Sequence, residues 1–186
     1  IYTRLVYDGM GSAPSIASIN GMLDRTIIAD GFSKTFSMTG WRLGYVIAPP
    51  KLAERLELLV THSTGSTAEF TQYAGMEALT GPQDFVHEMV AEYQKRRDRL
   101  VELVNAIPGV HAQKPQGAFY VFPNVKSFGI SEREIQLRLL EKEGVAVLAG
   151  SDFGPGGSGY IRLCYATSMD VIERAMEKVS RFFKSL

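Results

Sequence analysis

The sequence predicts an α/β protein. Short apolar runs rich in β-branched residues alternate with longer segments whose apolar residues recur at helical spacing. The pair Gly81-Pro82 separates two such groups of segments and is the clearest boundary in the chain. Of the 186 residues, 45% are hydrophobic, so the chain can bury a sizeable core as one large domain or two small ones.

Two short strands are expected in the first fifty residues. Residues 26–29 and 43–48 are apolar and partly β-branched, which is typical of short buried strands. Residues 15–25 form a connection into the first strand, and a Ser/Thr-rich turn joins the two. The pair Pro49-Pro50 ends the second strand at a point where proline is tolerated, because a helix begins there.

Three helices follow. Apolar periodicity predicts helices at 51–62, 67–80 and 83–107, and the segment Ser63-Thr64-Gly65-Ser66 breaks the first from the second. The third is long and amphipathic, with the charged run 95–98 on its solvated face. Pro108-Gly109 ends it.

The remaining residues predict a small sheet with helices. We expect strands at 110–113, 118–122, 145–148 and 160–165, and helices at 131–143 and 169–183. Ser131 with Glu134 has the spacing of a capping box. Along the strand 160–165, alternation puts Ile161, Leu163 and Tyr165 on one face and Arg162 on the other.

Composition excludes several classes of function. Twenty basic and twenty acidic side chains cancel, and no basic patch suggests a nucleic-acid partner. No apolar run is long enough to cross a bilayer, and the residues given predict no signal peptide. The single Cys164 excludes an internal disulfide and fits a cytoplasmic location. The three histidines are scattered without metal-ligand spacing, so no metal site is expected.

The segment with the most chemistry is the turn between the first two strands. Lys34 lies there, and Arg42 follows it by eight residues, just before the second strand. Loops at strand ends of α/β sheets commonly build ligand sites, and desolvation there lowers the pKa of a lysine that must attack a carbonyl. Arg42 offers the fixed charge and planar donors that suit a phosphate. The alternatives are a solvated surface lysine and an arginine paired with a carboxylate.

This segment, Ser33-Lys34-Thr35-Phe36-Ser37-Met38-Thr39-Gly40-Trp41-Arg42-Leu43-Gly44-Tyr45, resembles the cofactor-lysine signature of class I/II aminotransferases. These are fold-type I enzymes that use pyridoxal 5′-phosphate (PLP). The resemblance implies that Lys34 forms a Schiff base with the PLP aldehyde and that Arg42 binds the PLP phosphate. Ser33 is a further candidate for the phosphate. Some family members carry another serine where this chain has Gly31, so that hydroxyl contact is missing here. The pattern is matched by Gly31, Ser33, Lys34, Met38, Gly40, Arg42 and Gly44.

Two other segments resemble the same family. Ile1-Tyr2 resembles the end of its Asp-Glu-Ile-Tyr motif, which implies that the Tyr2 hydroxyl bonds the PLP phenolate oxygen; an ordinary strand residue is the alternative. The motif's aspartate, which pairs with the pyridine nitrogen, would precede Ile1. The strand 160–165 resembles the one whose arginine binds the substrate α-carboxylate, which implies this role for Arg162; a structural ion pair is the alternative. Phe119 and Tyr120 are weaker candidates, since core packing explains them equally well.

Two short motifs are set aside. Residues 31–35 end like a phosphate-binding P-loop but lack its upstream glycine. Residues 154–159 formally satisfy G-x-G-x-x-G, but an alternating apolar strand follows where a dinucleotide fingerprint needs a helix. We interpret this second run as a turn.

The resemblance extends along nearly the whole chain and implies the second half of a fold-type I enzyme. Residues 1–80 would be the end of the large domain with its mainly parallel sheet, and residues 81–186 the small α+β C-terminal domain. We expect further chain before Ile1. The implied activity is PLP-dependent transfer of an amino group between an amino acid and a 2-oxoacid, in a homodimer. A PLP-dependent carbon–sulfur lyase and a non-catalytic half-enzyme fragment are the alternatives, and aspartate is only one possible substrate.

Overall fold

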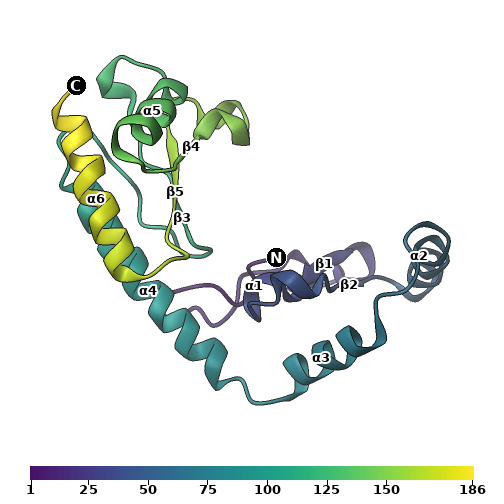
Figure 1. The fold of residues 1–186 in the computed structure, drawn as a ribbon. Coiled ribbons are helices and arrows are strands. Elements are labelled where there is room, and N and C mark those ends of the chain that lie inside the picture. Colours follow the sequence, from purple (N-terminus) through teal and green to yellow (C-terminus); the bar gives the residue numbers. More distant parts are fainter. The chain divides into compact units, whose positions relative to one another are not determined.

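The computed structural model describes all 186 residues, which form two compact units, Ile1–Val90 and Ala91–Leu186. The long helix α4 (Asp84–Asn105) carries the chain from the first unit into the second (Figure 1). Each unit has its own sheet. The boundary predicted at Gly81-Pro82 stays a prediction.

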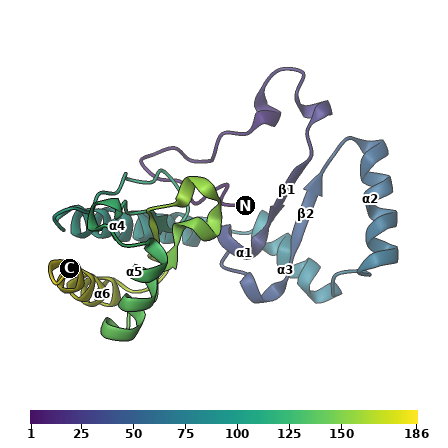
Figure 2. The ribbon, with the colours of Figure 1, turned by 90° about the horizontal axis from the view of Figure 1, so that it is seen from above.

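The first unit is built around a hairpin. After two 3₁₀ turns at Ile16–Ser18 and Leu23–Arg25, the chain forms β1 (Ile28–Gly31), the one-turn helix α1 (Phe32–Thr35) and β2 (Gly44–Ile47). The strands lie side by side as an antiparallel pair (Figure 2). Ile28 lies opposite Ile47, and Gly31 lies opposite Gly44. Residues 32–43 are therefore the connection of a hairpin, and both of its ends lie at the same end of the sheet.

Both predicted strands are present, but the expectation that they are buried was wrong. β1 begins two residues later than predicted, and Ile27 is 55% exposed. All four residues of β2 are exposed, including Val46 and Ile47. The physical reason is that this sheet has only two strands, so no further strand or packed layer covers them. The mainly parallel sheet expected here is represented in this chain by this antiparallel pair.

Two helices follow the hairpin, α2 (Pro50–Ser63) and α3 (Glu69–Thr80). α2 buries no residue, and α3 buries only Thr71 and Gly75. A Cβ added at Gly75 would lie 2.4 Å from Leu43 Cδ2 and 3.3 Å from Phe32 Cζ. The backbone of α3 therefore packs directly against the two ends of the lysine turn.

The second unit contains a three-stranded antiparallel sheet in the order β3-β5-β4. β3 (Tyr120–Val121) and β4 (Leu148–Ala149) flank the central β5 (Ile161–Cys164). The C-terminal part of α4, α5 (Glu132–Arg138) and α6 (Met169–Lys184) complete this unit. Its core is formed by buried side chains of the helices and the central strand, among them Leu100, Val104, Val121, Ile135, Leu139, Ile161, Leu163, Ile172, Met176, Val179 and Phe182.

Several predicted elements of this unit are shorter than expected. The strand 110–113 is reduced to a single bridge between His111 and Asn124. Of the predicted strand 145–148, only Leu148 pairs with β5. The chain leaves the preceding helix through Gly144, whose backbone is left-handed (φ 65°), and residues 145–147 have no strand partner. The helix 131–143 continues beyond α5 as a wider π-type turn, Leu139–Glu143.

Two local predictions about this unit are confirmed. Ser131 Oγ accepts a hydrogen bond from the Glu134 backbone N–H at 3.1 Å, as an N-cap does. The reciprocal half of the capping box is not formed, because the Glu134 carboxylate pairs with Arg138. The alternation along β5 is also as expected, with Ile161 and Leu163 buried.

None of the helices is both long and apolar enough to cross a membrane.

Candidate functional site

The turn that carries Lys34 has a well-defined backbone. The Phe32 N–H donates to the Leu43 carbonyl at 3.2 Å, and the Phe32 carbonyl accepts from Phe36 and Met38. Ser37 has a left-handed backbone with φ of 53°. Non-glycine residues in this region are uncommon and cluster at functional sites.

Lys34 lies on α1 immediately after β1, where the sequence predicted an irregular connection. It is half-buried, and its carbonyl accepts the Ser37 N–H at 3.3 Å. Ser33 precedes it on the same turn and is also half-buried. The hydroxyl and the amine are thus presented by one short helix directly at the end of a strand.

Arg42 lies at the other end of the turn, just before β2. Its backbone is left-handed with φ of 52°, and its side chain is exposed. One guanidinium nitrogen donates to the Thr39 carbonyl at 2.9 Å. Arg42 forms no ion pair, so the alternative of a structural partner for its charge is not realised in this chain. Its remaining N–H donors are available to an anion.

Tyr2 lies on the segment beside β1. It is half-buried, and the next residue, Thr3, donates from Oγ1 to Asp30 Oδ2 at 2.5 Å. Asp30 is the residue of β1 that precedes Gly31 and the lysine turn. The structure therefore brings the Tyr2 segment alongside the strand that leads to Lys34.

Asp30, which was not identified from the sequence, links the Tyr2 segment to both strands of the hairpin. Its carboxylate also accepts the Gly31 N–H at 2.7 Å and faces the Tyr45 hydroxyl of β2 at 3.5 Å. Partial burial, and then the nearby Asp30 charge, raise the pKa of Tyr45. A single aspartate directly after the apolar run 26–29 was the available signal, because a charge at such a position needs partners.

Arg162 lies on β5 in the second unit and is half-buried. Its Cζ lies 4.3 Å from the ring centroid of Tyr120 and 4.1 Å from that of Phe153. Its guanidinium forms no hydrogen bond or ion pair with the rest of the chain, so the structural ion pair considered above is absent. Ring contacts of this kind occupy the face of a guanidinium and leave its edge donors free.

Phe153 was not identified from the sequence. It ends the 3₁₀ turn Gly150–Phe153, and its ring also meets Phe122 edge-on at 5.8 Å. An aromatic residue directly before the glycine-rich run 154–159 was the only signal. That run forms a 3₁₀ turn at Pro155–Gly157 and then leads into β5, so it has the turn-then-strand character that we predicted.

The candidate residues are distributed over both units. Tyr2, Ser33, Lys34 and Arg42 belong to the first, and Arg162 belongs to the second. No cluster of three or more His, Cys, Asp or Glu side chains could hold a metal ion.

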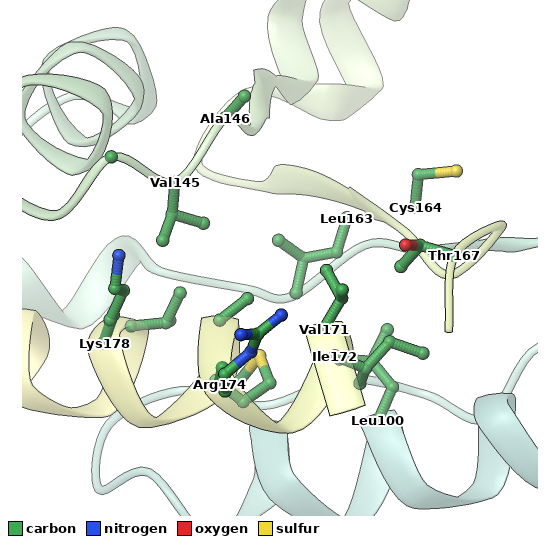
Figure 3. Close-up of a pocket in the computed structure, with 14 residues that line it drawn as sticks. Leu100, Val145, Ala146, Leu163, Cys164, Thr167, Val171, Ile172, Arg174 and Lys178 are labelled. Atoms are coloured by element: carbon green, nitrogen blue, oxygen red, sulfur yellow. The ribbon is translucent and has the colours of Figure 1, made fainter. Parts of the chain in front are cut away.

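The second unit also contains a cavity of about 540 Å³ between α6 and the sheet (Figure 3). Val145 and Ala146 form one wall, Leu163 and Cys164 another, and α6 contributes Val171. Its charged side chains already have partners: the Arg174 guanidinium pairs with Asp170, and Lys178 Nζ donates to the Glu143 carbonyl at 2.8 Å. We therefore do not assign a reaction to this cavity.

A lysine turn between the strands of a β-hairpin, followed by a small antiparallel α+β unit, is the arrangement expected for the second half of a fold-type I aminotransferase. The family model for aminotransferase class I and II matches residues 1–179, and the chain belongs to this family. The crystal structure of the aromatic aminotransferase from Pyrococcus horikoshii OT3 superposes with a TM-score of 0.94 at 40% identity. The match covers 100% of this chain and 50% of that one.

Curated relatives are similar to the same extent. An aromatic-amino-acid aminotransferase 2 from Thermococcus litoralis is 40% identical over 186 residues, which cover 99% of this chain and 47% of the relative. An aspartate aminotransferase from Pyrococcus abyssi is 39% identical over 186 residues, again 99% and 47%. The chain thus spans about half the length of the relatives that it matches.

Proposed function

We propose that this chain supplies cofactor- and substrate-binding residues for PLP-dependent transfer of an amino group between an amino acid and a 2-oxoacid. The observation that carries the proposal is the lysine turn, which presents Ser33 and Lys34 on α1 and ends at Arg42, whose guanidinium has no ion-pair partner. Family membership supports it, as do the relatives' names.

The residues of the first unit fit the chemistry of PLP. The cofactor carries an aldehyde, a phenolate oxygen and a phosphate dianion. Lys34 offers the amine for the aldehyde, Tyr2 a hydroxyl for the phenolate oxygen, and Arg42 with Ser33 the donors for the phosphate. A phosphate is best held by a fixed positive charge with planar donors, which Arg42 provides.

When bound, PLP supplies an electron sink that weakens bonds at the substrate α-carbon. Lys34 then has two roles: its amine holds the cofactor before substrate arrives, and it afterwards moves the proton at the substrate α-carbon as a general base.

Arg162 is proposed to bind the substrate α-carboxylate. All amino acids and 2-oxoacids share this group, so one arginine serves both halves of a transamination. The edge of its guanidinium is free for a two-pronged contact with a carboxylate, since only its face is occupied by Tyr120 and Phe153.

Covalent labelling tests the central assignment. The chain is incubated with PLP, reduced with borohydride and mapped by peptide mass spectrometry; we expect the pyridoxyl group on Lys34. Lys34→Ala should lose the label, whereas Lys51→Ala, which removes an exposed lysine of α2, should keep it. In an amino-transfer assay of the whole protein, Lys34→Ala should lower the rate by about a hundredfold or more. Label on another lysine would overturn the assignment.

Further parts of the proposal concern the whole protein. We propose that residues 1–80 belong to a large cofactor-binding domain and residues 81–186 to a small domain, and that the protein acts as a homodimer in the cytoplasm. A carbon–sulfur lyase would need the same lysine and arginines. Product analysis separates the two: cystathionine would be cleaved by a lyase, whereas an aminotransferase converts an amino acid and 2-oxoacid pair.

A further inference from the structure

Arg162 has an unusual environment for a half-buried arginine. The rings of Tyr120 and Phe153 lie 4.3 and 4.1 Å from its Cζ, and no carboxylate of the chain pairs with it. Tyr120 is held by the sheet, since β3 pairs with β5 beside Arg162. Phe153 lies outside the sheet, on the segment 149–159, which leaves the sheet after Ala149 of β4 and returns to it before β5. The position of Phe153 therefore depends on what holds the part of this segment between the strands.

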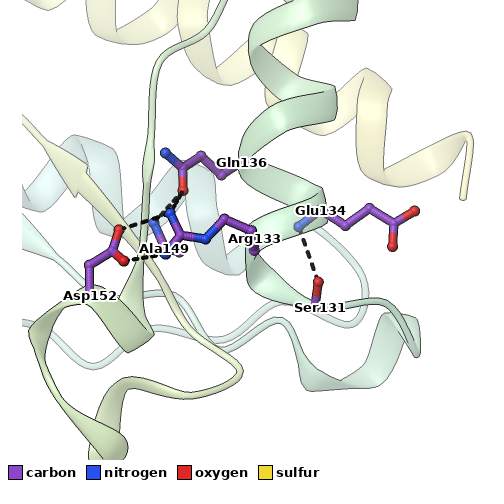
Figure 4. A network of polar contacts seen from close by, with 6 residues as sticks. All are labelled: Ser131, Arg133, Glu134, Gln136, Ala149 and Asp152. Carbon is purple, nitrogen blue, oxygen red and sulfur yellow. Dashed lines mark hydrogen bonds and ion pairs between the residues drawn. The ribbon is translucent and has the colours of Figure 1, made fainter.

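Three side chains of α5 hold the segment. Arg133 pairs with both carboxylate oxygens of Asp152, next to Phe153 (Figure 4). Gln136 Oε1 accepts the Ala149 backbone N–H at 3.1 Å. Glu132 Oε2 accepts the Gly159 backbone N–H at 3.1 Å.

The chemistry of Glu132 agrees with these contacts. The pKa of its carboxyl is lowered, first by a hydrogen bond from the Ser151 side chain and then by backbone donors that include Gly159. At neutral pH the charged form therefore accepts from both parts of the segment. Gln136 thus contacts the segment at its start, Arg133 contacts it beside Phe153, and Glu132 contacts it at its end.

The segment also closes on itself. A Cβ added at Gly150 would lie 2.3 Å from the Gly157 carbonyl oxygen, and one added at Gly157 would lie 2.0 Å from the Gly150 carbonyl oxygen. The two backbones thus approach so closely that only glycine fits at either position. The residues between them, including Phe153, form a short closed loop.

We propose that α5 is the positioning element of the carboxylate site: Glu132, Arg133 and Gln136 fix the segment 149–159, and that segment keeps the Phe153 ring on the Arg162 guanidinium so that its edge donors face a carboxylate. This inference rests on the proposed function, because it assumes that Arg162 binds the substrate carboxylate. Glu132, Arg133 and Gln136 act through Phe153 and do not touch substrate themselves.

The test follows Arg162 directly in the full chain. The Nε–Hε signal of Arg162 is assigned by NMR from its loss in Arg162→Lys. An aromatic ring 4.1 Å from Cζ displaces this signal from its usual position. We expect the double variant Arg133→Met with Gln136→Met to move the signal toward the usual arginine value. Titration with 2-oxoglutarate at Arg162 should then give a roughly three- to tenfold higher Kd, the effect of one lost cation–π contact or hydrogen bond.

The chain offers a matched control. Arg138 pairs with Glu134 on the same helix, and this pair does not contact the segment 149–159. The double variant Arg138→Met with Glu134→Gln should therefore leave both the signal and the affinity unchanged. Gln136→Glu keeps an acceptor for the Ala149 N–H and should behave like the wild type.

Phe153→Leu tests the ring contact without touching α5. It should reproduce the effect of the Arg133/Gln136 variant on the Arg162 signal, and it keeps the inference testable if that variant does not fold. If 2-oxoglutarate does not perturb Arg162 in the wild type, the carboxylate role within the proposed function fails. If it does, and the Arg133/Gln136 and Phe153→Leu variants both bind it as tightly as the wild type, only the positioning role fails.

Discussion

At Arg162, the two ring contacts and the absence of an ion pair separate a binding residue from a structural one. A half-buried guanidinium that served the fold alone would be expected to pair with a carboxylate or a carbonyl, because an unpaired charge is costly to bury. Here the aromatic faces of Tyr120 and Phe153 provide the contact, and the edge donors remain free. Arg42 is similar in this respect: it is exposed and uses one donor on Thr39.

The substitution Arg162→Lys distinguishes a substrate-binding role of Arg162 from a structural one. Lysine keeps the charge but has neither the planar fork nor the flat face that stacks on rings. We expect the Kd for amino acids and for 2-oxoacids to rise together by about tenfold, while PLP occupancy, measured by its absorbance after gel filtration, is unchanged. Unaltered substrate constants would show that Arg162 has a structural role.

At the scale of single elements, α3 supports the lysine turn through one glycine. Gly75 is buried against Phe32 and Leu43, the residues that begin and end the connection between β1 and β2. The nearest atom to an added Cβ is Leu43 Cδ2, the end of a flexible side chain, whereas Phe32 offers a rigid ring. A small side chain at Gly75 therefore needs only Leu43 to move, whereas a larger one also meets the Phe32 ring and costs more.

We expect Gly75→Ala to change the free energy of unfolding by less than about 1 kcal/mol, because the gain in helix propensity over glycine offsets the displacement of Leu43. Gly75→Val should destabilise the first unit by about 1–3 kcal/mol, since the larger side chain also meets Phe32. Gln72→Val, at an exposed position of α3, is the control for β-branching. Denaturant unfolding followed by Trp41, the only tryptophan, measures this; equal stability of both Gly75 variants would contradict the packing.

Helices of this chain could be predicted well because their signal is local. Apolar periodicity and the break at Pro108-Gly109 place α4 and α6 within one or two residues of their observed bounds. Strands depend on partners that periodicity does not reveal, so the stretch 145–148 is apolar but mostly unpaired. Phe153 was missed for the same reason: its role comes from a contact with Arg162, nine residues away, across a loop whose closure is a three-dimensional property.

At the scale of the whole molecule, the two units differ in how much of their apolar surface is buried within the chain. α6 buries five side chains: Ile172, Met176, Val179, Phe182 and Phe183. α2 buries none, and the apolar residues Phe70, Tyr73 and Met76 of α3 are 59–71% exposed. Opening of a helix costs less free energy when fewer apolar contacts are lost.

Native-state hydrogen exchange therefore should report two levels of stability in this chain. We expect the amides of α6 to exchange only through the largest opening of the second unit, and those of α2 to exchange at least about a hundredfold faster, with α3 between them near Gly75. Residues 84–90 and 98–105 of α4 provide an internal comparison, because they are one helix divided between the units. Equal protection of α2 and α6 would contradict the expectation and would mean that a surface absent from this chain, such as a second copy, covers α2. Dilution then separates the two cases. If the protection of α2 falls as the chain concentration is lowered, it comes from an assembly; if it stays constant, it comes from the unit itself.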